Sequence, residues 1–427
     1  MKVLVIGSGG REHAIIRKLN ESPEVTEVIC APGNGGIAAD AVCFSVKATD
    51  ISGMCELAAR EAVDFVCVTP DDPLAIGMVD ALEEKGFACF GPDRAAAQIE
   101  ASKVFAKNMM KKYGIPTADY AVFDDPAKAL AYVKEQNSWP SVIKADGLAL
   151  GKGVIIAQNA GEAEKALQEM MVDRTFGNAG SQVVIEEFLS GPEVSVLAFT
   201  DGKTVRPMIS SMDHKRANDN DEGLNTGGMG TIAPSPFYTE EVADRCMKEI
   251  FLPTVKAMNA EGRPFKGCLY FGLMITEKGP KVIEYNSRFG DPETQVVLPL
   301  LKSDLFRIMQ ACRSGTLAET ETEWSDQCAA CVMIASGGYP GSYAKGKVIR
   351  GLDENGRHAG VTVYHSGTKF ENGQYLTNGG RVLGISALGR TLGEALEKSY
   401  AAVKEITFEN AHYRTDIGKK ALERGNA

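Results

Sequence analysis

The chain has 427 residues, enough for about three domains, and its 44% of hydrophobic residues suits ordinary buried cores. Its 46 basic and 56 acidic residues give a net charge of −10, and no block of lysine and arginine occurs, which argues against nucleic-acid binding. No apolar run reaches the roughly 18 residues of a membrane span, no signal-peptide pattern opens the chain, and the 10 cysteines lie scattered through apolar segments, so we expect a cytoplasmic protein without a membrane partner.

Residues 1–102 alternate strand-like and helix-like segments. The strand-like segments are KVLVIG, EVICAPG, DFVCVTP and FACFGP, and helices are expected from about Glu12 and over roughly 74–85. This rhythm is typical of βαβ units, in which parallel strands alternate with helices. We therefore predict an α/β chain (α+β overall) that begins with a Rossmann-like parallel-sheet domain.

A glycine-rich turn, Gly7-Ser8-Gly9-Gly10-Arg11-Glu12, links the first strand to the first helix. A dinucleotide fingerprint would need glycine where Glu12 stands, and no clear ribose-binding acid ends a strand ~20 residues later, so an NAD-dependent dehydrogenase is not favoured. Gly9 and Gly10 at a helix N-terminus can still bind a phosphate, and Arg11 can add a charged contact. A small phosphorylated substrate fits this turn better than a dinucleotide; a tight turn without a ligand is the alternative.

Residues 103–325 differ in character and are expected to form a second domain. The stretch from Asp93 to Lys112 is predicted as one long helix, broken at Gly114 and Pro116. The segments WPSVIKAD and GVIIAQ then flank a glycine-rich turn, and a helix is expected over about 161–171. The strands SQVVIEEFL, EVSVLAFT and TVRPMIS follow, and another helix is predicted over 239–258.

Residues 326–427 are expected to form a small mixed β domain. Its strand-like segments are ACVMIASGGYP, GVTVYHSGTKF and RVLGISALG, and an amphipathic helix is predicted over 391–406. Cys328 and Cys331 make a lone C-x-x-C pattern within an apolar segment. Without a second pair this pattern favours a buried strand over a zinc or redox site.

The segment from Lys144 to Gly153, KADGLALGKG, resembles a P-loop but is not one. Three residues rather than four separate Gly147 from Gly151, and Gly153 replaces the Ser or Thr that would bind Mg²⁺. A strand follows it, whereas a P-loop opens a helix. We expect a glycine loop on an antiparallel hairpin that folds over phosphates, with Lys144 neutralising their oxygens; an exposed lysine beside a glycine hairpin is the alternative.

A third motif, VIEEFLSGPE, spans residues 184–193. A strand that ends after Glu186 can offer a backbone C=O and N–H to the edge of adenine, and Glu193 can accept from ribose hydroxyl groups. Alone this signal is weak, because two glutamates at a strand end are common. It gains weight from its position between the glycine loop and the strand that follows.

The most informative segment is KVIEYNSRFGDPETQ, residues 281–295. In a strand, alternation places Val282, Glu284, Asn286 and Arg288 on one face. Glu284 and Asn286 supply oxygen ligands of the kind that Mg²⁺ takes from proteins, and Arg288 can hold an anion beside the metal. The strand's partner is predicted to be CLYFGLMITEKG, and a solvated edge strand is the alternative.

Together these motifs, in this order, resemble the ATP-grasp superfamily. Further segments make the chain similar to the glycinamide ribonucleotide synthetase family: VLVIGSGGREHA, APGNGG, IKADGLALGKGV, MDHKRANDNDEGLNTGGMG and SGGYPGSYAKG. The resemblance covers essentially the whole chain and implies a central ATP-grasp domain with a mobile lid at about 122–190. It implies that ATP phosphorylates glycine and that 5-phosphoribosylamine attacks the glycyl phosphate, which gives glycinamide ribonucleotide, ADP and phosphate in purine biosynthesis. Another ATP-grasp ligase or carboxylase of purine metabolism is the alternative.

The resemblance also implies roles for individual residues. Catalytic roles go to Arg288, Lys144 and Asp213, and the metal, Mg²⁺ or Mn²⁺, goes to Glu284 and Asn286. ATP binding goes to Lys103, Lys144, Gly151, Lys152, Gly153, Glu186, Glu187, Phe188, Leu189 and Glu193. Substrate binding goes to Gly9, Gly10, Arg11, Asp71, Asp213, Lys215, Asn225, Thr226, Gly227, Gly228, Arg288, Asp291 and Glu293.

Several of these assignments carry open questions. Lys107 is the alternative to Lys103 as the lysine that contacts ATP. Asp213 can instead be a loop acid paired with Lys215 or Arg216. Gly272 stands where many superfamily members carry a further acid, and Asp71 stands where the family usually shows glutamate. His214 is given no role as a base. A monomer or small homo-oligomer is expected.

Overall fold

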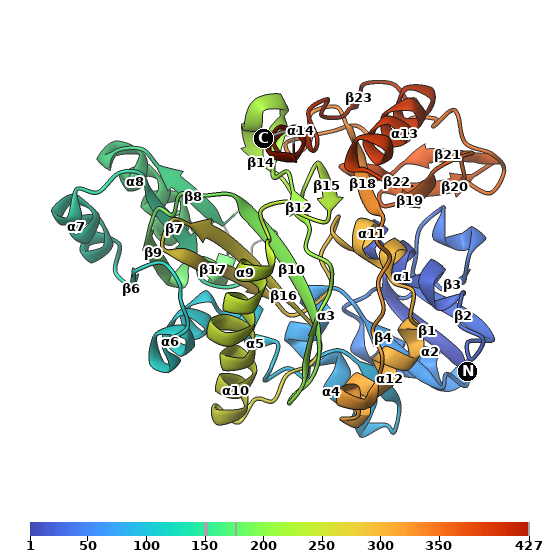
Figure 1. Cartoon of the computed structure of the whole chain (residues 1–427), viewed down its shortest axis with the longest axis horizontal. Coiled ribbons are helices and arrows are strands. Elements are labelled where there is room, and N and C mark those ends of the chain that lie inside the picture. The colour runs from blue at the N-terminus through green and yellow to red at the C-terminus, as the bar shows by residue number, and fades with distance from the viewer. Residues whose placement is uncertain (149–152, 176, 426–427) are drawn as a thin grey trace.

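The computed structural model describes residues 1–148, 153–175 and 177–425. Figure 1 shows the N-terminal domain in blue at the lower right and the C-terminal section in orange and red above it. A sheet that comprises strands between Tyr120 and Glu187 lies at the left, and the central sheet lies between these parts.

A five-stranded parallel sheet forms the N-terminal domain, as predicted, with the order β3-β2-β1-β4-β5. The strands are β1 (Lys2–Gly7), β2 (Glu27–Pro32), β3 (Val42–Cys43), β4 (Phe65–Val68) and β5 (Ala88–Phe90), and the helices are α1 (Gly10–Leu19), α2 (Ile51–Arg60), α3 (Asp71–Ile76) and α4 (Met78–Glu84). The order reverses between β1 and β4, and in open α/β sheets ligands bind at the carboxyl ends of strands at such a point. Arg11 and Asp71 follow these two strand ends.

The central sheet is antiparallel, with the order β11-β10-β16-β17. Its strands are β10 (Glu193–Asp201), β11 (Val205–Pro207), β16 (Lys266–Thr276) and β17 (Gly279–Asn286). One face shares a buried core with α6 (Lys103–Tyr113) and α10 (Leu252–Ala260), which continues α9 (Glu240–Arg245). The other face packs with the N-terminal domain and α12 (Leu305–Ser314), so both faces are buried.

A second antiparallel sheet, named here the lid sheet, has the order β6-β9-β7-β8. It contains β6 (Tyr120–Phe123), β7 (Ser141–Ala145), β8 (Val154–Ala157) and β9 (Val183–Glu187), and α7 (Pro126–Gln136) and α8 (Ala160–Leu167) share its separate core. It meets the central sheet at β17, where Thr117 bridges to Val282 and the Lys281 ammonium lies 2.7 Å from Glu187. The lid sheet is therefore attached to β17, the edge strand of the central sheet.

The C-terminal sheet has the order β12-β15-β18-β22-β19, and β23 also pairs with β18. Its members are β12 (Met212–Asp213), β15 (Gly230–Ala233), β18 (Cys328–Ser336), β19 (Thr362–His365), β22 (Arg381–Gly389) and β23 (Ala411–His412). The predicted helix near the C-terminus is α13 (Leu392–Glu405), which packs on β18 and β22. Strands β12 and β15 come from the central part of the sequence, so this sheet joins the two parts.

The shorter elements complete the chain. The remaining strands pair as two hairpins, β13 (Arg216–Asn218) with β14 (Glu222–Asn225) and β20 (Thr368–Glu371) with β21 (Gln374–Thr377). The short helices are α5 (Gln98–Ala101), α11 (Thr294–Val297) and α14 (Lys419–Gly425). The first hairpin lies between β12 and β15, in the segment that carries several predicted substrate residues.

Two predicted helices are each divided. The helix expected over 74–85 is α3 and α4, separated at Gly77, whose φ of +92° ends the first helix. The helix expected from Asp93 to Lys112 is wrong in its first part: α5 ends at Ala101, and α6 begins after Ser102. Ser102 adopts an extended conformation, and its hydroxyl accepts from the Phe105 N–H at 3.1 Å, which caps α6.

The pairing of β16 with β17 corrects the predicted strand face. Gly272 pairs with Glu284 but Leu273 pairs with Val282, so β17 has an extra residue at Ile283. Such a bulge shifts the alternation of side chains. Val282 is therefore buried in the core, contrary to the prediction, whereas Glu284 and Asn286 line a cleft.

Among the described residues, no helix has the length and apolar character needed to cross a membrane. All 10 cysteines are free thiols, most of them buried. Cys328 and Cys331 lie in β18, the strand predicted for them.

Candidate active site

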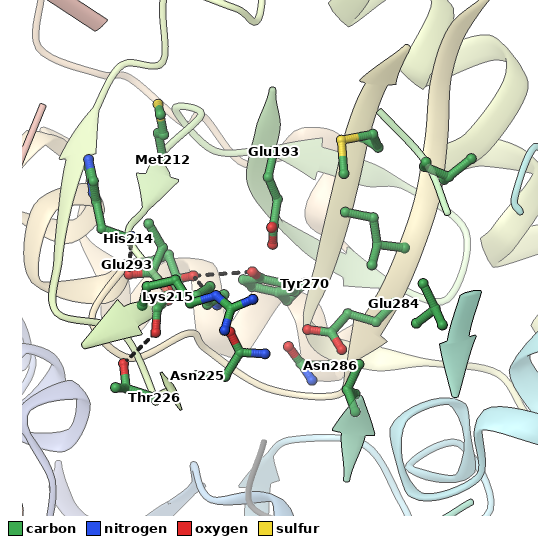
Figure 2. A pocket seen from close by; sticks show the side chains of 18 of the residues that line it. Glu193, Met212, His214, Lys215, Asn225, Thr226, Tyr270, Glu284, Asn286 and Glu293 are labelled. Carbon is green, nitrogen blue, oxygen red and sulfur yellow. Dashed lines mark hydrogen bonds and ion pairs between the residues drawn. The ribbon is translucent and has the colours of Figure 1, made fainter. Parts of the chain in front are cut away.

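A cleft of about 870 Å³ lies between the lid sheet, the central sheet and the C-terminal section. It is lined by most of the predicted site residues: Arg11, Asp71, Lys103, Lys144, Gly153, Glu186, Glu187, Phe188, Leu189, Glu193, Asp213, Lys215, Asn225, Thr226, Gly227, Glu284, Asn286, Arg288, Asp291 and Glu293. Figure 2 shows Glu284 and Asn286 entering from one side and Lys215 and Asn225 from the other. Gly9, Gly10 and Gly228 lie outside this lining, and the predictions for Gly151 and Lys152 lie outside the described residues.

A buried carboxylate links two lysines at the lid end of the cleft. The Lys144 ammonium on β7 lies 3.0 Å from Glu186 and donates to the Ile283 carbonyl at 3.1 Å. The other Glu186 oxygen lies 3.0 Å from the Lys107 ammonium, which also donates to the Thr117 hydroxyl at 2.8 Å. Burial lowers the pKa of Lys107 to about 8, although Glu186 opposes the shift. The Glu186 side chain thus fixes the lid sheet to α6.

Lys103 begins α6 and faces the same space as Lys144. Its ammonium donates to the Gly147 carbonyl at 2.8 Å, so it touches the start of the glycine loop. Burial lowers the pKa of Lys103, and the nearby Glu284 carboxylate opposes that shift. Two lysines and the Glu284 carboxylate therefore gather in one part of the cleft.

Glu284 and Asn286 offer oxygen atoms suited to a hard cation. The Asn286 amide nitrogen donates to Glu100 at 2.8 Å, which directs the amide oxygen away from that carboxylate. A Cβ at Gly272 would lie 3.2 Å from the Glu284 side chain, so this position has little room for the further acid. No group of three or more His, Cys, Asp or Glu side chains that could hold a metal occurs among the described residues. Two oxygens fit Mg²⁺, which takes most of its ligands from phosphates and water.

Arg288 follows the end of β17 and points into the cleft. Its Nη2 lies 3.0 Å from Glu100, and its Nη1 donates to the Phe289 carbonyl at 3.2 Å. Its Nε is buried without a hydrogen-bond partner among the described residues. Burial opposes the charged form, yet Glu100 and Asp71 raise the pKa of Arg288. A buried donor without a partner indicates a place for an acceptor that arrives with a ligand.

Asp71 and Arg11 bring the N-terminal domain to the cleft. Burial would raise the pKa of Asp71, but Arg288 and Arg11 outweigh burial and lower it. Arg11 is itself held by Glu12 at 2.6 Å and by the Phe289 carbonyl at 3.1 Å. These contacts join the two strand ends at the reversal of the parallel sheet to the segment after β17.

The cleft's other wall carries Asp213, Lys215 and Glu293. The Lys215 ammonium lies 2.7 Å from Asp213 and 3.9 Å from Glu293, so the pair expected as the alternative for Asp213 is present. The Tyr270 hydroxyl donates to Glu293 at 3.1 Å. Burial raises the pKa of Glu193 to about 7; Lys215 opposes this shift, and the Glu284 carboxylate adds to it. Acids outnumber lysines here, so a bound cationic group would be stabilised.

The segment between β12 and β15, which carries several of the predicted substrate residues, is called the substrate loop. Two features hold it in place. Gly228 has a φ of +115°, and a Cβ there would lie 2.5 Å from both the Asp213 carboxylate and Pro292. Arg381 of β22 donates to the carbonyl groups of Gly227 and Asp291, each at 2.8 Å. Gly228 therefore lies behind Asp213 and permits its close packing, and the C-terminal section fixes the loop.

His214 is a structural link between distant segments. Its Nε2 accepts from the Gly418 N–H at 3.0 Å, so its proton lies on Nδ1, which donates to the Gly230 carbonyl at 3.0 Å. Burial lowers the pKa of His214 to about 4. Neither ring nitrogen is free to act as a base, in line with the role withheld from it.

Several residues that line the cleft were not assigned from the sequence: Glu100, Lys107, Tyr270, Tyr339 and Arg381. Tyr339 lies in the segment SGGYPGSYAKG, to which the sequence analysis gave no residue role, and the others lie in no motif whose spacing signals chemistry. Lys107 was considered only as a competitor of Lys103. The others act through contacts between segments far apart in the chain, which local patterns do not reveal.

Three family models match consecutive parts of the chain: the N domain (residues 1–100), the ATP-grasp (A) domain (residues 101–294) and the C domain (residues 329–420) of phosphoribosylglycinamide synthetase. A phosphoribosylamine–glycine ligase of Caldanaerobacter subterraneus subsp. tengcongensis is 48% identical and covers 98% of this chain and 99% of its own. The crystal structure of phosphoribosylamine–glycine ligase from Thermotoga maritima matches with a TM-score of 0.85 and 33% identity, over 98% of this chain and all of that one.

A biotin carboxylase domain from Hydrogenobacter thermophilus matches with a TM-score of 0.73 over 96% of this chain and 91% of its own, but at 18% identity it shares the fold alone. The much closer ligases cover the chain from end to end, so the alternative of a different purine ligase or carboxylase is not supported. By these matches the chain belongs to the phosphoribosylglycinamide synthetase family, the ATP-dependent phosphoribosylamine–glycine ligases of purine biosynthesis.

Proposed function

We propose that this chain ligates glycine to 5-phosphoribosylamine through glycyl phosphate, with the cleft residues in the roles described below. One observation carries the proposal. Arg288, whose buried Nε has no hydrogen-bond partner in the part of the chain that the structure describes, and Asp213 lie in the same cleft as the oxygen pair of Glu284 and Asn286. A reaction between glycine and ATP requires a group that binds the glycine carboxylate, a group that binds the glycine ammonium, and a site for a cation.

ATP is proposed to lie between the lid sheet and the central sheet. Lys103 and Lys144 would neutralise its phosphates, because both ammonium groups face the space beside Glu284. The backbone from Glu186 to Leu189 would contact adenine at the end of β9. Lys107 is held by Glu186 and Thr117, so we assign the phosphate contact to Lys103. A cation at Glu284 and Asn286, Mg²⁺ or Mn²⁺, would supply positive charge against the phosphate oxygens.

Glycine is proposed to lie between Arg288 and Asp213. Arg288 would hold the carboxylate through Nε, and Asp213 would accept from the ammonium. The Lys215 ammonium now occupies that side of Asp213 at 2.7 Å, so glycine binding requires Lys215 to share the carboxylate. Phosphoribosylamine would lie nearer the N-terminal domain, beside Arg11, Asp71, Asp291 and Glu293.

The two proposed steps balance in atoms and charge. A glycine carboxylate oxygen attacks the γ-phosphorus of ATP, the bond to the ADP oxygen breaks, and glycyl phosphate forms. The amine of phosphoribosylamine then attacks the glycyl carbon, loses a proton, and displaces phosphate. Arg288 and Lys144 offset the repulsion between the reacting anions, so positioning and charge carry the first step.

Closure of the lid sheet would keep water from glycyl phosphate, which hydrolyses readily. We further propose that the enzyme works in the cytoplasm as a monomer or small homo-oligomer, with small molecules as its only substrates. Strand β7 ends beside the cleft and leads into the glycine loop, which supports a role for this sheet in covering ATP.

ADP release measured with glycine and phosphoribosylamine, each omitted in turn, tests this function. Full release is expected only with both substrates. Glycine labelled with ¹⁸O in its carboxylate should transfer one labelled oxygen to the released phosphate, because that oxygen attacks the γ-phosphorus. Phosphate without label would exclude the acyl-phosphate route.

Variants connect the function to the metal pair. Glu284→Ala is expected to lower kcat/KM by about 10²-fold or more, since it removes a group that stabilises developing charge. Glu277→Ala, at an exposed glutamate in the turn that joins β16 to β17, is the matched control and should retain activity. Full ADP release by the Glu284 variant would refute the metal assignment.

A further inference from the structure

A buried glutamate of the cleft has no part in the steps above. Glu100 lies on α5, in the segment that leads from the N-terminal domain to α6, and is 8% exposed. Its carboxylate contacts three consecutive residues, the last of β17 and the two that follow it. They include Asn286, the proposed metal ligand, and Arg288, the proposed holder of glycine.

Each oxygen of Glu100 has two partners. Oε1 accepts from the Asn286 amide at 2.8 Å and lies 3.0 Å from Arg288 Nη2. Oε2 accepts from the Ser287 N–H at 2.7 Å and from the Ser287 hydroxyl at 2.8 Å. The Asn286 amide, the Arg288 guanidinium and the Ser287 N–H can only donate in this arrangement, so the site suits an ionised carboxylate, which only accepts. Burial raises the pKa of Glu100, and the Arg288 guanidinium opposes that shift.

The contact with Asn286 decides which atom of that amide faces the cleft. A carboxylate cannot donate, so the NH₂ group of Asn286 must face Glu100 and its oxygen must point elsewhere. In the opposite orientation the Asn286 oxygen would face the Glu100 carboxylate, so two acceptors would meet, and the Asn286 NH₂ group would face the cation. Without Glu100, nothing in the Asn286 amide itself favours the orientation that can bind a metal.

The contact with Arg288 directs its guanidinium in the same way. Glu100 holds Nη2 on one side, and Asp71 attracts the guanidinium from the N-terminal domain. Nε, beside Nη2 in the same plane, has no hydrogen-bond partner among the described residues and remains for a ligand. One carboxylate thus orients the group proposed for the metal and the group proposed for glycine.

We propose that Glu100 is a positioning residue that turns the amide oxygen of Asn286 toward the metal and aims Arg288 at the glycine carboxylate. The proposal rests on the proposed function, because it takes Asn286 as a metal ligand and Arg288 as the glycine contact. Beyond that function, it assigns the orientations of Asn286 and Arg288 to a single residue, which lies where the N-terminal domain meets the central domain.

Glu100→Gln tests the proposal with almost no change in shape. The Ser287 N–H is buried and fixed in the backbone, so the new amide must turn its oxygen to Ser287 and its NH₂ to Asn286 and Arg288. Asn286 then has to flip, which presents its own NH₂ to the metal. The variant should bind Mn²⁺ in the presence of ADP about 10- to 100-fold more weakly, as expected when a partner of a metal ligand is lost. Electron paramagnetic resonance of free Mn²⁺ measures this affinity without turnover.

A second substitution separates orientation from folding. In Glu100→Gln/Asn286→Asp, the Gln NH₂ donates to one Asp oxygen and leaves the other for Mn²⁺, while the total charge equals that of the wild type. Mn²⁺ affinity should return close to the wild-type value. Arg288 still lacks its carboxylate, so KM for glycine should stay about tenfold raised in both variants, the equivalent of one lost charge-assisted bond.

Asp201→Asn is the matched control for the loss of a buried carboxylate. Asp201 is 4% exposed and accepts from the N–H groups of Lys203, Thr204 and Leu317, away from the cleft lining. Its variant should lose stability in urea but keep Mn²⁺ affinity and KM for glycine. Equal losses of Mn²⁺ affinity in the Asp201 and Glu100 variants would reduce Glu100 to a structural role.

Two other results overturn the inference. Unchanged Mn²⁺ affinity in Glu100→Gln would show that Asn286 is oriented without it. Failure of Asn286→Asp to restore affinity would show that the loss is not one of orientation. In each case Glu284→Ala is the reference. If that variant also binds Mn²⁺ normally, the metal assignment itself is wrong. If it binds Mn²⁺ weakly, the metal assignment stands and only the role of Glu100 is refuted.

Discussion

Gly228 gives a sharp test of how the substrate loop holds Asp213. The residue has a φ of +115°, and a methyl group at this position would lie 2.5 Å from both the Asp213 carboxylate and the Pro292 ring. The proline is a ring in the segment after β17 and the carboxylate ends a side chain that can rotate, so in Gly228→Ala we expect the carboxylate to move. Asp213 then loses its proposed contact with the glycine ammonium.

The size of the effect follows from that contact. A hydrogen bond to a charged group is worth about 1.5–3 kcal/mol, and about 1.36 kcal/mol changes a rate tenfold, so kcat/KM for glycine should fall roughly 10- to 150-fold. The KM for ATP should stay unchanged, because ATP is proposed to lie on the lid side of the cleft. Initial rates of ADP release at varied glycine, with the other substrates saturating, measure this value.

Gly262 supplies the matched control. It has a φ of +70° but no atom within 4 Å of an added Cβ, so Gly262→Ala introduces strain without a clash. That variant should lose about 1 kcal/mol of stability and keep its kinetics. If Gly228→Ala folds and retains the wild-type kcat/KM for glycine, Asp213 does not bind the ammonium as proposed.

Three further expectations concern other parts of the molecule. Burial lowers the pKa of His13 and His214 to about 4 and that of His365 to about 3, below the ordinary 6.5, so the unfolded chain binds more protons between these values. The free energy of unfolding should therefore fall as pH falls from 6.5 toward 4, by up to about 1.4 kcal/mol per pH unit for each histidine. Urea unfolding at pH 7.5 and at pH 5 measures this loss. An unchanged free energy of unfolding would contradict the expectation. Arg414 is 1% exposed, has ion pairs of 2.9 and 2.8 Å with two aspartates, and donates to the Arg216 carbonyl at 3.1 Å, so it holds the loop between β12 and β15. Arg414→Met should therefore lower the melting temperature and raise KM for glycine but not for ATP. Equal changes in both KM values would argue against a specific role. Asp71→Asn should raise KM for phosphoribosylamine about tenfold, the value of one charged contact, and an unchanged KM in the same assay would remove this residue from the substrate site.

Much of the fold followed from local patterns. The parallel N-terminal sheet, the pairing of β16 with β17 and helix α13 were all predicted, because hydrophobic periodicity and turn residues decide such elements within one segment. The errors arose where a single residue changed the local geometry. Ser102 caps a new helix inside the long one, and the extra residue at Ile283 turns Val282 into the core.

Site prediction divided in a similar way. Glu284, Asn286 and Lys144 lie in contiguous motifs whose residue types suit a metal and phosphates, and they meet in one cleft. Glu100 and Arg381 do not stand out in the sequence, because each acts on segments far from its own position. Such long-range contacts depend on the packing of whole domains, which periodicity does not encode.

The C-terminal sheet has a consequence for how the chain can be divided. Strands β12 and β15 flank the substrate loop, and β15 pairs along its length with β18 from the last section. A fragment that stops before β18 would leave β15 as an unpaired edge and the loop without its Arg381 contacts. The C-terminal section that begins with β18 therefore cannot be removed without disturbing the substrate loop. We expect a fragment that ends before β18 to lack ligase activity.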